Sequence, residues 1–188
     1  MTKNIMIVGV GGQGTLLASR VLGNTVINEG YDVKVSEVHG MSQRGGSVVT
    51  YVKYGDKVYS PIIDQGEADT ILAFELLEAY RSLPYLKKGG KMIVNAQQID
   101  PMPVITGAVQ YPDDIAGKLS AKVDTTVVDA LSAAKEAGNI KAVNVVLIGV
   151  MAKNWDIPYE VWTDTIKKTV PEKFLEVNLK AFELGYNS

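Results

Sequence analysis

The apolar residues of the chain fall into short continuous runs that alternate with stretches in which they recur every three to four positions. The run Asn4–Val10 is apolar and leads into a glycine cluster, which predicts a buried strand. From Thr15 to Glu29 the apolar positions follow helical spacing, and Gly30 is expected to end that helix. A second strand is expected over Tyr31–Val38. The chain thus opens with a strand, a turn, a helix and a strand, as α/β proteins do.

The same alternation continues to the C-terminus. Val143–Met151 is apolar nearly all round, so its periodicity fits either a buried helix or a strand, and the continuation of the pattern to Lys153 favours a helix. The whole pattern predicts a three-layer α/β/α fold with a mostly parallel sheet and a Rossmann-like start. Further strands are expected at Thr70–Phe74, Lys91–Asn95 and Val123–Val128, and helices near Leu76–Tyr80, Ala130–Ala137, Pro158–Thr169 and Pro171–Leu184.

Two segments depart from this alternation. Ser47–Tyr54 and Lys57–Tyr59 predict a β-hairpin inserted after the second strand, because the Gly55-Asp56 pair between them is of the Gly-X type that two-residue hairpin turns favour. Asp100–Asp114 holds three of the seven prolines and is expected to be irregular, with a short strand near Ala108–Tyr111.

Composition narrows the class of protein. The 188 residues, with no linker visible, predict a single domain over 1–188, and the net charge of -2 gives no reason to expect nucleic acid as a partner. The chain has no cysteine and one histidine, His39, so disulfides, cysteine nucleophiles, cysteine-bound iron–sulfur clusters and a structural zinc site are excluded. No apolar run is long enough to span a membrane, and no secretion signal is visible, so we expect a cytoplasmic protein.

A glycine-rich turn follows the first strand. Gly9-Val10-Gly11-Gly12-Gln13-Gly14 matches G-x-G-x-x-G between a strand and a helix, where backbone amides can hold the phosphates of a dinucleotide. Glu37, at the end of the second strand, stands where a Rossmann enzyme keeps its ribose-binding acid. However, a glycine loop and a hairpin follow that strand instead of a crossover helix. Two other interpretations of the turn therefore stay open: it could bind another anion, such as a coenzyme A phosphate, or it could have a purely structural role.

A second polar loop, Ser36–Ser47, combines a carboxylate, the histidine, a guanidinium and adjacent glycines. Both loops leave carboxyl ends of strands, where α/β proteins bind ligands, so we expect them to be neighbours. His39 fits a hydrogen-bonded loop histidine or a proton-transfer group, and Arg44 fits an anion grip or an ion pair with Glu37 or Asp64. No catalytic residue and no metal ligand is predicted. The candidate ligand-binding or active-site interface residues are Gly11, Gly12, Gln13, Gly14, Glu37, His39, Gln43, Arg44, Gly45 and Gly46.

The two loops together resemble those of a known family. Gly9–Gly14 followed by Glu37–Val48 is similar to the gamma-type domain of the pyruvate and 2-oxoacid:ferredoxin oxidoreductases, and the similarity covers essentially the whole chain. Within that family the indolepyruvate:ferredoxin oxidoreductases, which have a separate small (beta) subunit, are most similar. Val170–Lys173 and Asn178–Phe182 also resemble this subgroup.

The resemblance implies a reaction and a set of partners. A 2-oxoacid, coenzyme A and oxidised ferredoxin would give acyl-CoA, carbon dioxide and reduced ferredoxin. Thiamine diphosphate, Mg and the iron–sulfur clusters would belong to a large catalytic subunit. The small subunit would bind no cofactor alone, would be inactive alone, and would complete the active-site region through the two loops, in contact with coenzyme A or substrate.

Other functions stay open at this point. The resemblance to the indolepyruvate subgroup favours an arylpyruvate such as indolepyruvate as the oxoacid, and pyruvate or 2-oxoglutarate is the alternative. The chain could instead be a free-standing Rossmann-type dinucleotide-binding protein, or a non-enzymatic module that binds a nucleotide. A homodimer of the isolated chain also stays open.

Overall fold

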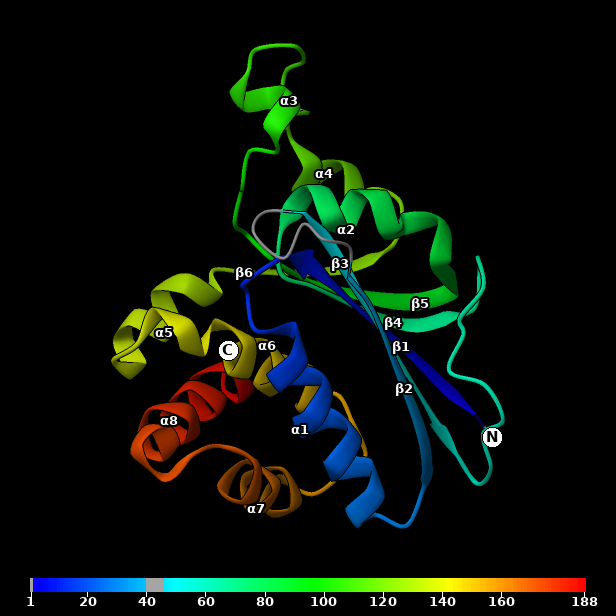
Figure 1. Cartoon of the computed structure of the whole chain (residues 1–188), viewed down its shortest axis with the longest axis vertical. Helices are drawn as coiled ribbons and strands as arrows, with labels where there is room; N and C mark the ends of the chain where they lie inside the picture. Colours follow the sequence, from blue (N-terminus) through cyan, green and yellow to red (C-terminus); the bar gives the residue numbers. More distant parts are fainter. Residues whose placement is uncertain (1, 40–45) are drawn as a thin grey trace.

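A computed structural model describes residues 2–39 and 46–188 of the chain. The strands form one six-stranded sheet in the order β2-β3-β1-β4-β5-β6 (Figure 1). Their bounds are Lys3–Val10 for β1, Asp32–His39 for β2, Ser47–Gly55 for β3, Ala68–Ala73 for β4, Leu86–Asn95 for β5 and Asp124–Val128 for β6.

The sheet is mostly parallel, as the sequence predicts. β1, β4, β5 and β6 pair in parallel, whereas β3 pairs antiparallel with both β1 and β2. β2 therefore points the same way as β1, and among the described strands β3 alone runs in the opposite direction. The Rossmann-like start is present in β1, the glycine turn and the following helix, but β3 lies between β1 and β2.

The predicted hairpin between residues 47–54 and 57–59 is wrong. β3 continues to Gly55, and no strand follows at 57–59. Both edges of β3 are already paired, one with β1 and one with β2, so no edge is free for a returning strand. The chain instead leaves the sheet after Gly55, where the Asp32 carboxylate accepts a hydrogen bond from the Val58 amide at 2.9 Å.

The helices cover both faces of the sheet (Figure 1). α1, α5, α6, α7 and α8 cover one face, and α2 and α4 the other. The 3-10 turns are Leu83–Tyr85, Ile140–Ala142 and Glu172–Phe174. The helix bounds are Thr15–Asn28 for α1, Leu76–Ser82 for α2, Met102–Ile105 for α3, Ile115–Ser120 for α4, Ala130–Ala137 for α5, Val143–Ala152 for α6, Tyr159–Thr169 for α7 and Leu175–Tyr186 for α8.

Two hydrophobic cores result from the alternation of side chains along the strands. In β1, Ile5 and Ile7 face the larger helical layer, whereas Met6 and Val8 face α2 and α4. All four side chains are buried. Because a strand with both faces buried has no polar side, the run in β1 is continuously apolar rather than alternating.

Residues 100–114 are mostly irregular, as expected, but the short strand predicted near Ala108–Tyr111 is wrong. They contain the single-turn helix α3, and no strand forms at 108–111. The amides of Ala108 and Val109 donate to the Pro103 carbonyl at 2.9 Å and 3.2 Å, so they close a turn on α3 instead of joining the sheet.

The apolar segment at 143–152 is the buried helix α6, which confirms the choice of helix over strand. Every residue of α6 is buried. None of the helices in residues 2–39 and 46–188 is long and apolar enough to cross a bilayer. α6 owes its burial to its position between the sheet and α8 (Figure 1).

Close approach of α6 and α8 depends on two glycines. A Cβ atom at Gly149 would lie 2.8 Å from the Tyr186 amide nitrogen and would also collide with the Phe182 carbonyl oxygen. A Cβ atom at Gly185 would lie 2.9 Å from the Val146 carbonyl carbon. The two helix backbones therefore touch, and neither can move away without opening the core.

We predict that Gly149→Ala lowers the free energy of unfolding by about 1–3 kcal/mol, because the added methyl group overpacks a backbone contact. The matched control is Gly23→Ala in α1, where the new Cβ would meet only the Val35 Cγ2 atom at 3.7 Å. That variant should gain about 0.5–1 kcal/mol from the higher helix propensity of alanine. Urea unfolding of both proteins checks the prediction, and equal effects would contradict it.

Candidate functional site

The glycine turn and the second polar loop meet at the carboxyl-end edge of the parallel strands. The Gly11 amide, just after β1, donates to the Gly46 carbonyl oxygen, just before β3, at 2.9 Å. The Glu37 carboxylate on β2 lies 3.4 Å from the Ser19 hydroxyl on α1. The prediction that the two loops are neighbours is therefore confirmed.

Glycines give this turn its shape. Gly12 and Gly14 have positive φ angles of 94° and 83°, a region that other residues rarely adopt. Space around the Gly12 Cβ position is open, whereas a Cβ atom at Gly14 would lie 2.6 Å from the Asn144 Nδ2 atom. Asn144 lies on the buried helix α6 and donates to the Gly14 carbonyl at 3.1 Å. α6 thus holds the start of α1 in place.

The backbone amides of the turn are partly used within the fold. The Gly11 amide donates to Gly46, and the Gln13 amide donates to the Val10 carbonyl at 3.2 Å. Among the hydrogen bonds of the described residues, none uses the amides of Gly12 or Gly14. Anion binding by all four amides would need the first two bonds to break, so the turn can offer an anion two amides without rearrangement.

The Gln13 side chain contacts polar groups at the ends of three strands. Its Oε1 atom accepts from the Val10 amide at 2.7 Å, at the end of β1. Its Nε2 atom donates to the Phe74 carbonyl at 3.0 Å, just past β4, and lies 3.4 Å from the Gln97 Oε1 atom, just past β5. These contacts give Gln13 a structural task at this edge, and its predicted contact with a ligand stays a prediction.

Two buried polar residues at the same edge were not among the sequence candidates. Asn95, the last residue of β5, donates to the Phe74 carbonyl at 3.1 Å and accepts from the Ala130 amide at 3.2 Å. Glu75, two residues after β4, is 1% exposed. Both stand at the carboxyl ends of buried strands, so the rule that selected the two loops could also have found them.

Glu75 receives three hydrogen bonds. One carboxylate oxygen accepts from the Glu78 amide at 2.9 Å, which caps α2. The other accepts from the Ile99 amide at 3.1 Å and from the Tyr111 hydroxyl at 2.6 Å. The pKa of Tyr111 is raised above its usual value, mainly by burial and secondly by its hydrogen bond to Glu75. The hydroxyl therefore stays protonated and donates to the carboxylate.

A second buried carboxylate, Glu78, joins α2 to the end of the second polar loop. It accepts from the Ser47 hydroxyl at 2.5 Å and pairs with the Arg81 guanidinium at 2.7 Å. Ser47 is the first residue of β3. The strand ends, α2 and both loops are therefore joined by one polar network.

Part of the predicted site lies outside the described residues. Gln43, Arg44 and Gly45 belong to that part, and so does the side chain of His39, whose backbone pairs with Val48 in the sheet. The expected ion pair of Arg44 with Glu37 or Asp64 also lies outside the described residues, because Arg44 is one of the residues that are not described. Of the ten candidates, the structure brings together Gly11, Gly12, Gln13, Gly14, Glu37 and Gly46.

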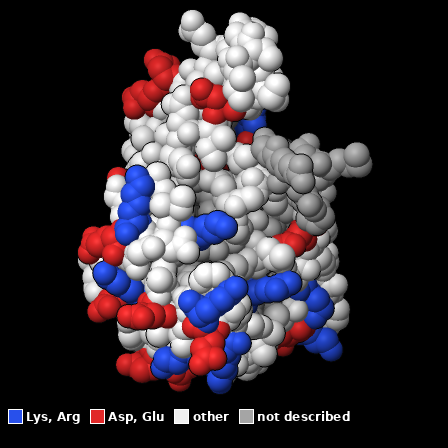
Figure 2. Space-filling view, turned by 60° about the vertical axis from the view of Figure 1, so that its left-hand side comes forward, with Lys and Arg blue, Asp and Glu red and all other residues white. Residues whose placement is uncertain are grey.

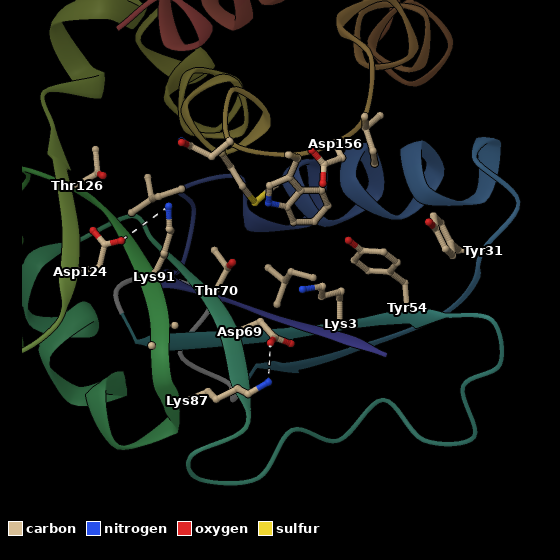
Figure 3. Close-up of a pocket in the computed structure, with 18 of the residues that line it drawn as sticks. Lys3, Tyr31, Tyr54, Asp69, Thr70, Lys87, Lys91, Asp124, Thr126 and Asp156 are labelled. Carbon is tan, nitrogen blue, oxygen red and sulfur yellow. Dashed lines mark hydrogen bonds and ion pairs between the residues drawn. The ribbon is translucent and has the colours of Figure 1, made fainter. Parts of the chain in front are cut away.

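A cleft lies at the opposite end of the strands, where the parallel strands begin (Figure 3). It has a volume of about 720 Å³ and is lined by the amino-end residues of β1, β4, β5 and β6. Two of its lysines already pair with aspartates, Lys87 with Asp69 at 3.1 Å and Lys91 with Asp124 at 3.8 Å. Since open α/β sheets bind ligands at carboxyl ends, we place the candidate site at the loop edge.

We predict that Gln13→Ala lowers the free energy of unfolding by about 1–3 kcal/mol, because the amide of the buried residue Val10 loses its side-chain partner and the Phe74 carbonyl loses a donor. Gln98→Ala is the matched control: this glutamine is exposed, and its side chain donates to the nearby Asp100 carboxylate at 2.7 Å. Its effect should stay within about 0.5 kcal/mol. Thermal or urea unfolding measures both, and an unaffected Gln13→Ala protein would contradict the structural task.

Known proteins similar to this chain share its length and its fold. Residues 4–188 match the family described as pyruvate ferredoxin/flavodoxin oxidoreductase. The indolepyruvate oxidoreductase subunit IorB of Thermococcus kodakarensis is 45% identical, over 97% of this chain and 93% of its own length. The keto/oxoacid ferredoxin oxidoreductase gamma subunit from Geobacter sulfurreducens superposes with a TM-score of 0.73 at 25% identity, covering 98% of this chain and 96% of that one.

A more distant relative carries the same unit within a longer chain. The ketoisovalerate oxidoreductase subunit VorA of Methanothermobacter marburgensis is 28% identical over 96% of this chain but only 35% of its own length. The match along residues 4–188 and the 45% identity to a full-length relative lead to one conclusion. The chain belongs to the pyruvate ferredoxin/flavodoxin oxidoreductase family.

Proposed function

We propose that this chain is the small subunit of a ferredoxin-dependent 2-oxoacid oxidoreductase that acts on arylpyruvates such as indolepyruvate. The observation that carries the proposal is the 45% identity to an indolepyruvate oxidoreductase subunit over nearly the full length of both chains. The reaction oxidatively decarboxylates the oxoacid. The acyl group passes to the thiol of coenzyme A, carbon dioxide leaves, and ferredoxin takes up the electrons.

The redox groups belong to a large catalytic subunit in this proposal. The chain has no cysteine to hold an iron–sulfur cluster. Within residues 2–39 and 46–188, no group of three His, Asp or Glu side chains could hold a metal ion. As the family resemblance implies, thiamine diphosphate, Mg and the clusters belong to the partner in this proposal. The partner would also contact ferredoxin, and no step of the reaction is placed on this chain.

The small subunit contributes its loop edge to the shared site. The two-loop candidates, Gly11–Gly14, Glu37, His39 and Gln43–Gly46, would face coenzyme A or substrate across the subunit boundary. The amides of Gly12 and Gly14 and the Arg44 guanidinium supply donors for an anion there. The polar network around Gln13, Glu75 and Asn95 joins the strand ends at this edge, so the fold itself holds the glycine turn in place.

The alternatives have less support. The second candidate is the gamma subunit of an oxidoreductase that acts on pyruvate. It has weaker support, because the pyruvate/ketoisovalerate oxidoreductases common subunit gamma of Thermococcus kodakarensis is only 27% identical. A free-standing dinucleotide-binding protein is disfavoured for two reasons. The Gly11 amide already donates to the Gly46 carbonyl, and the antiparallel strand β3 follows β2 where a Rossmann fold has a crossover helix. Cytoplasmic location and a homodimer of the isolated chain stay predictions.

We expect the purified chain alone to reduce no viologen with any 2-oxoacid. Co-expression with its large subunit should give a complex that reduces viologen with indolepyruvate and coenzyme A, and more slowly with pyruvate or 2-oxoglutarate. The large subunit alone is the control. Turnover by the lone chain, or NAD-linked activity, would refute the proposal, and faster turnover of pyruvate would replace the arylpyruvate assignment.

We also expect Arg44→Ala to raise the apparent KM for coenzyme A or oxoacid about tenfold or more in the assembled enzyme, as loss of a charge-assisted hydrogen bond does. Arg20→Ala, at an exposed position on α1, is the matched control and should leave KM unchanged. Steady-state viologen kinetics distinguish the two. Identical KM values for both variants and the unaltered complex would remove Arg44 from the site.

A further inference from the structure

Residues 100–113 form an arm that projects from the body at the end of the molecule that carries α3 (Figure 1). From Pro101 to Pro112 the arm contains no charged residue. Met102, Ile105 and Val109 are 65%, 65% and 55% exposed, and they belong to neither hydrophobic core. Figure 2 shows the arm tip as an uncharged projection with acidic residues near its base.

The tip of the arm, residues 102–109, is held by hydrogen bonds within the arm, and its apolar side chains belong to neither core. The Pro101 carbonyl accepts from the Ile105 amide at 3.1 Å, which closes α3, and the Pro103 carbonyl accepts from the amides of Ala108 and Val109. The Thr106 hydroxyl donates to the Met102 carbonyl at 3.0 Å. Internal hydrogen bonds and fixed proline φ angles therefore hold the apolar side chains outward in one arrangement.

One buried carboxylate anchors both ends of the arm. The Ile99 amide, before the arm, and the Tyr111 hydroxyl, near its end, donate to the same oxygen of Glu75 at 3.1 Å and 2.6 Å. Glu75 follows β4 at the edge that carries the glycine turn. The position of the arm is thus fixed relative to the candidate site rather than to a distant surface.

We propose that this arm is a preformed docking element that inserts its apolar tip into a pocket of the large catalytic subunit. The inference deepens the proposed function and rests on it. An ordered, uncharged tip with three exposed apolar side chains matches the apolar core of a protein interface, from which charged residues are depleted.

The relatives indicate why the large subunit is the occupant. In the ketoisovalerate oxidoreductase subunit VorA, the matched unit is 35% of a longer chain, so the unit lies within a larger enzyme polypeptide there. In this chain the arm and the two candidate loops share one edge, joined through Glu75 and Gln13. A large subunit that covers the loops therefore meets the arm as well, and the acidic residues Asp100, Asp113 and Asp114 would form a polar rim around the contact.

The test measures binding of purified variants to the separately purified large subunit by surface plasmon resonance. Ile105→Asp should weaken binding by at least about tenfold, as loss of an apolar anchor at an interface does. Ile62→Asp is the matched control: this isoleucine is 49% exposed and follows β3 at the opposite edge of the sheet. It should bind like the unaltered chain. Thermal unfolding of both variants should match the unaltered chain, because neither side chain belongs to a core.

Each result separates this inference from the proposed function. If the unaltered chain binds the large subunit and Ile105→Asp binds equally well, the arm is not the docking element, while the subunit assignment stands. If the unaltered chain does not bind, the proposed function fails and the inference with it. If Ile105→Asp instead splits a dimer of the isolated chain without weakening the large-subunit complex, the occupant is a second copy and the inference is overturned.

Discussion

The insertion of β3 between β1 and β2 determines how this protein differs from a dinucleotide-binding fold. β3 runs antiparallel to both neighbours and brings Gly46 against the glycine turn, where its carbonyl accepts from the Gly11 amide. The same insertion brings the second polar loop beside the turn, because that loop connects β2 to β3. The turn that carries the dinucleotide fingerprint thereby becomes one of two neighbouring loops. Two of its four backbone amides, those of Gly11 and Gln13, are already hydrogen-bonded within the chain.

The edge that carries these loops is held by buried and half-buried polar groups whose partners come from distant parts of the chain. Gln13 joins the ends of β1, β4 and β5, Asn144 holds the start of α1, and Glu75 holds both ends of the arm. Buried polar groups are costly unless they are satisfied, so such a network specifies one arrangement of the glycine turn, the strand ends and the arm. Rigidity is useful at a boundary between subunits, because a preformed surface loses less conformational entropy when the partner binds.

The sequence predicted the elements that local pattern controls and missed those that depend on distant neighbours. Local pattern was enough for three elements. The apolar run of β1 predicted a buried strand, the helical spacing of α1 predicted a helix, and the all-round apolar segment of α6 predicted a buried helix. The Gly55-Asp56 pair also looked like a local hairpin signal, but both edges of β3 were already paired with strands from elsewhere in the chain. Single polar residues such as Glu75, Asn95 and Asn144 give no periodic signal, so their roles emerge only once the strand ends are assembled. The short strand expected near Ala108–Tyr111 is absent, because the Pro103 carbonyl accepts from the amides of Ala108 and Val109.

Hydrogen exchange of the chain, free and in complex with the large subunit, tests the orientation of the loop edge most directly. The account predicts that exchange slows in residues 11–14 and 102–109 on complex formation, while residues 87–91, which line the amino-end cleft, exchange as in the free chain. Slower exchange confined to the cleft residues, with the glycine turn and the arm unaffected, would contradict it.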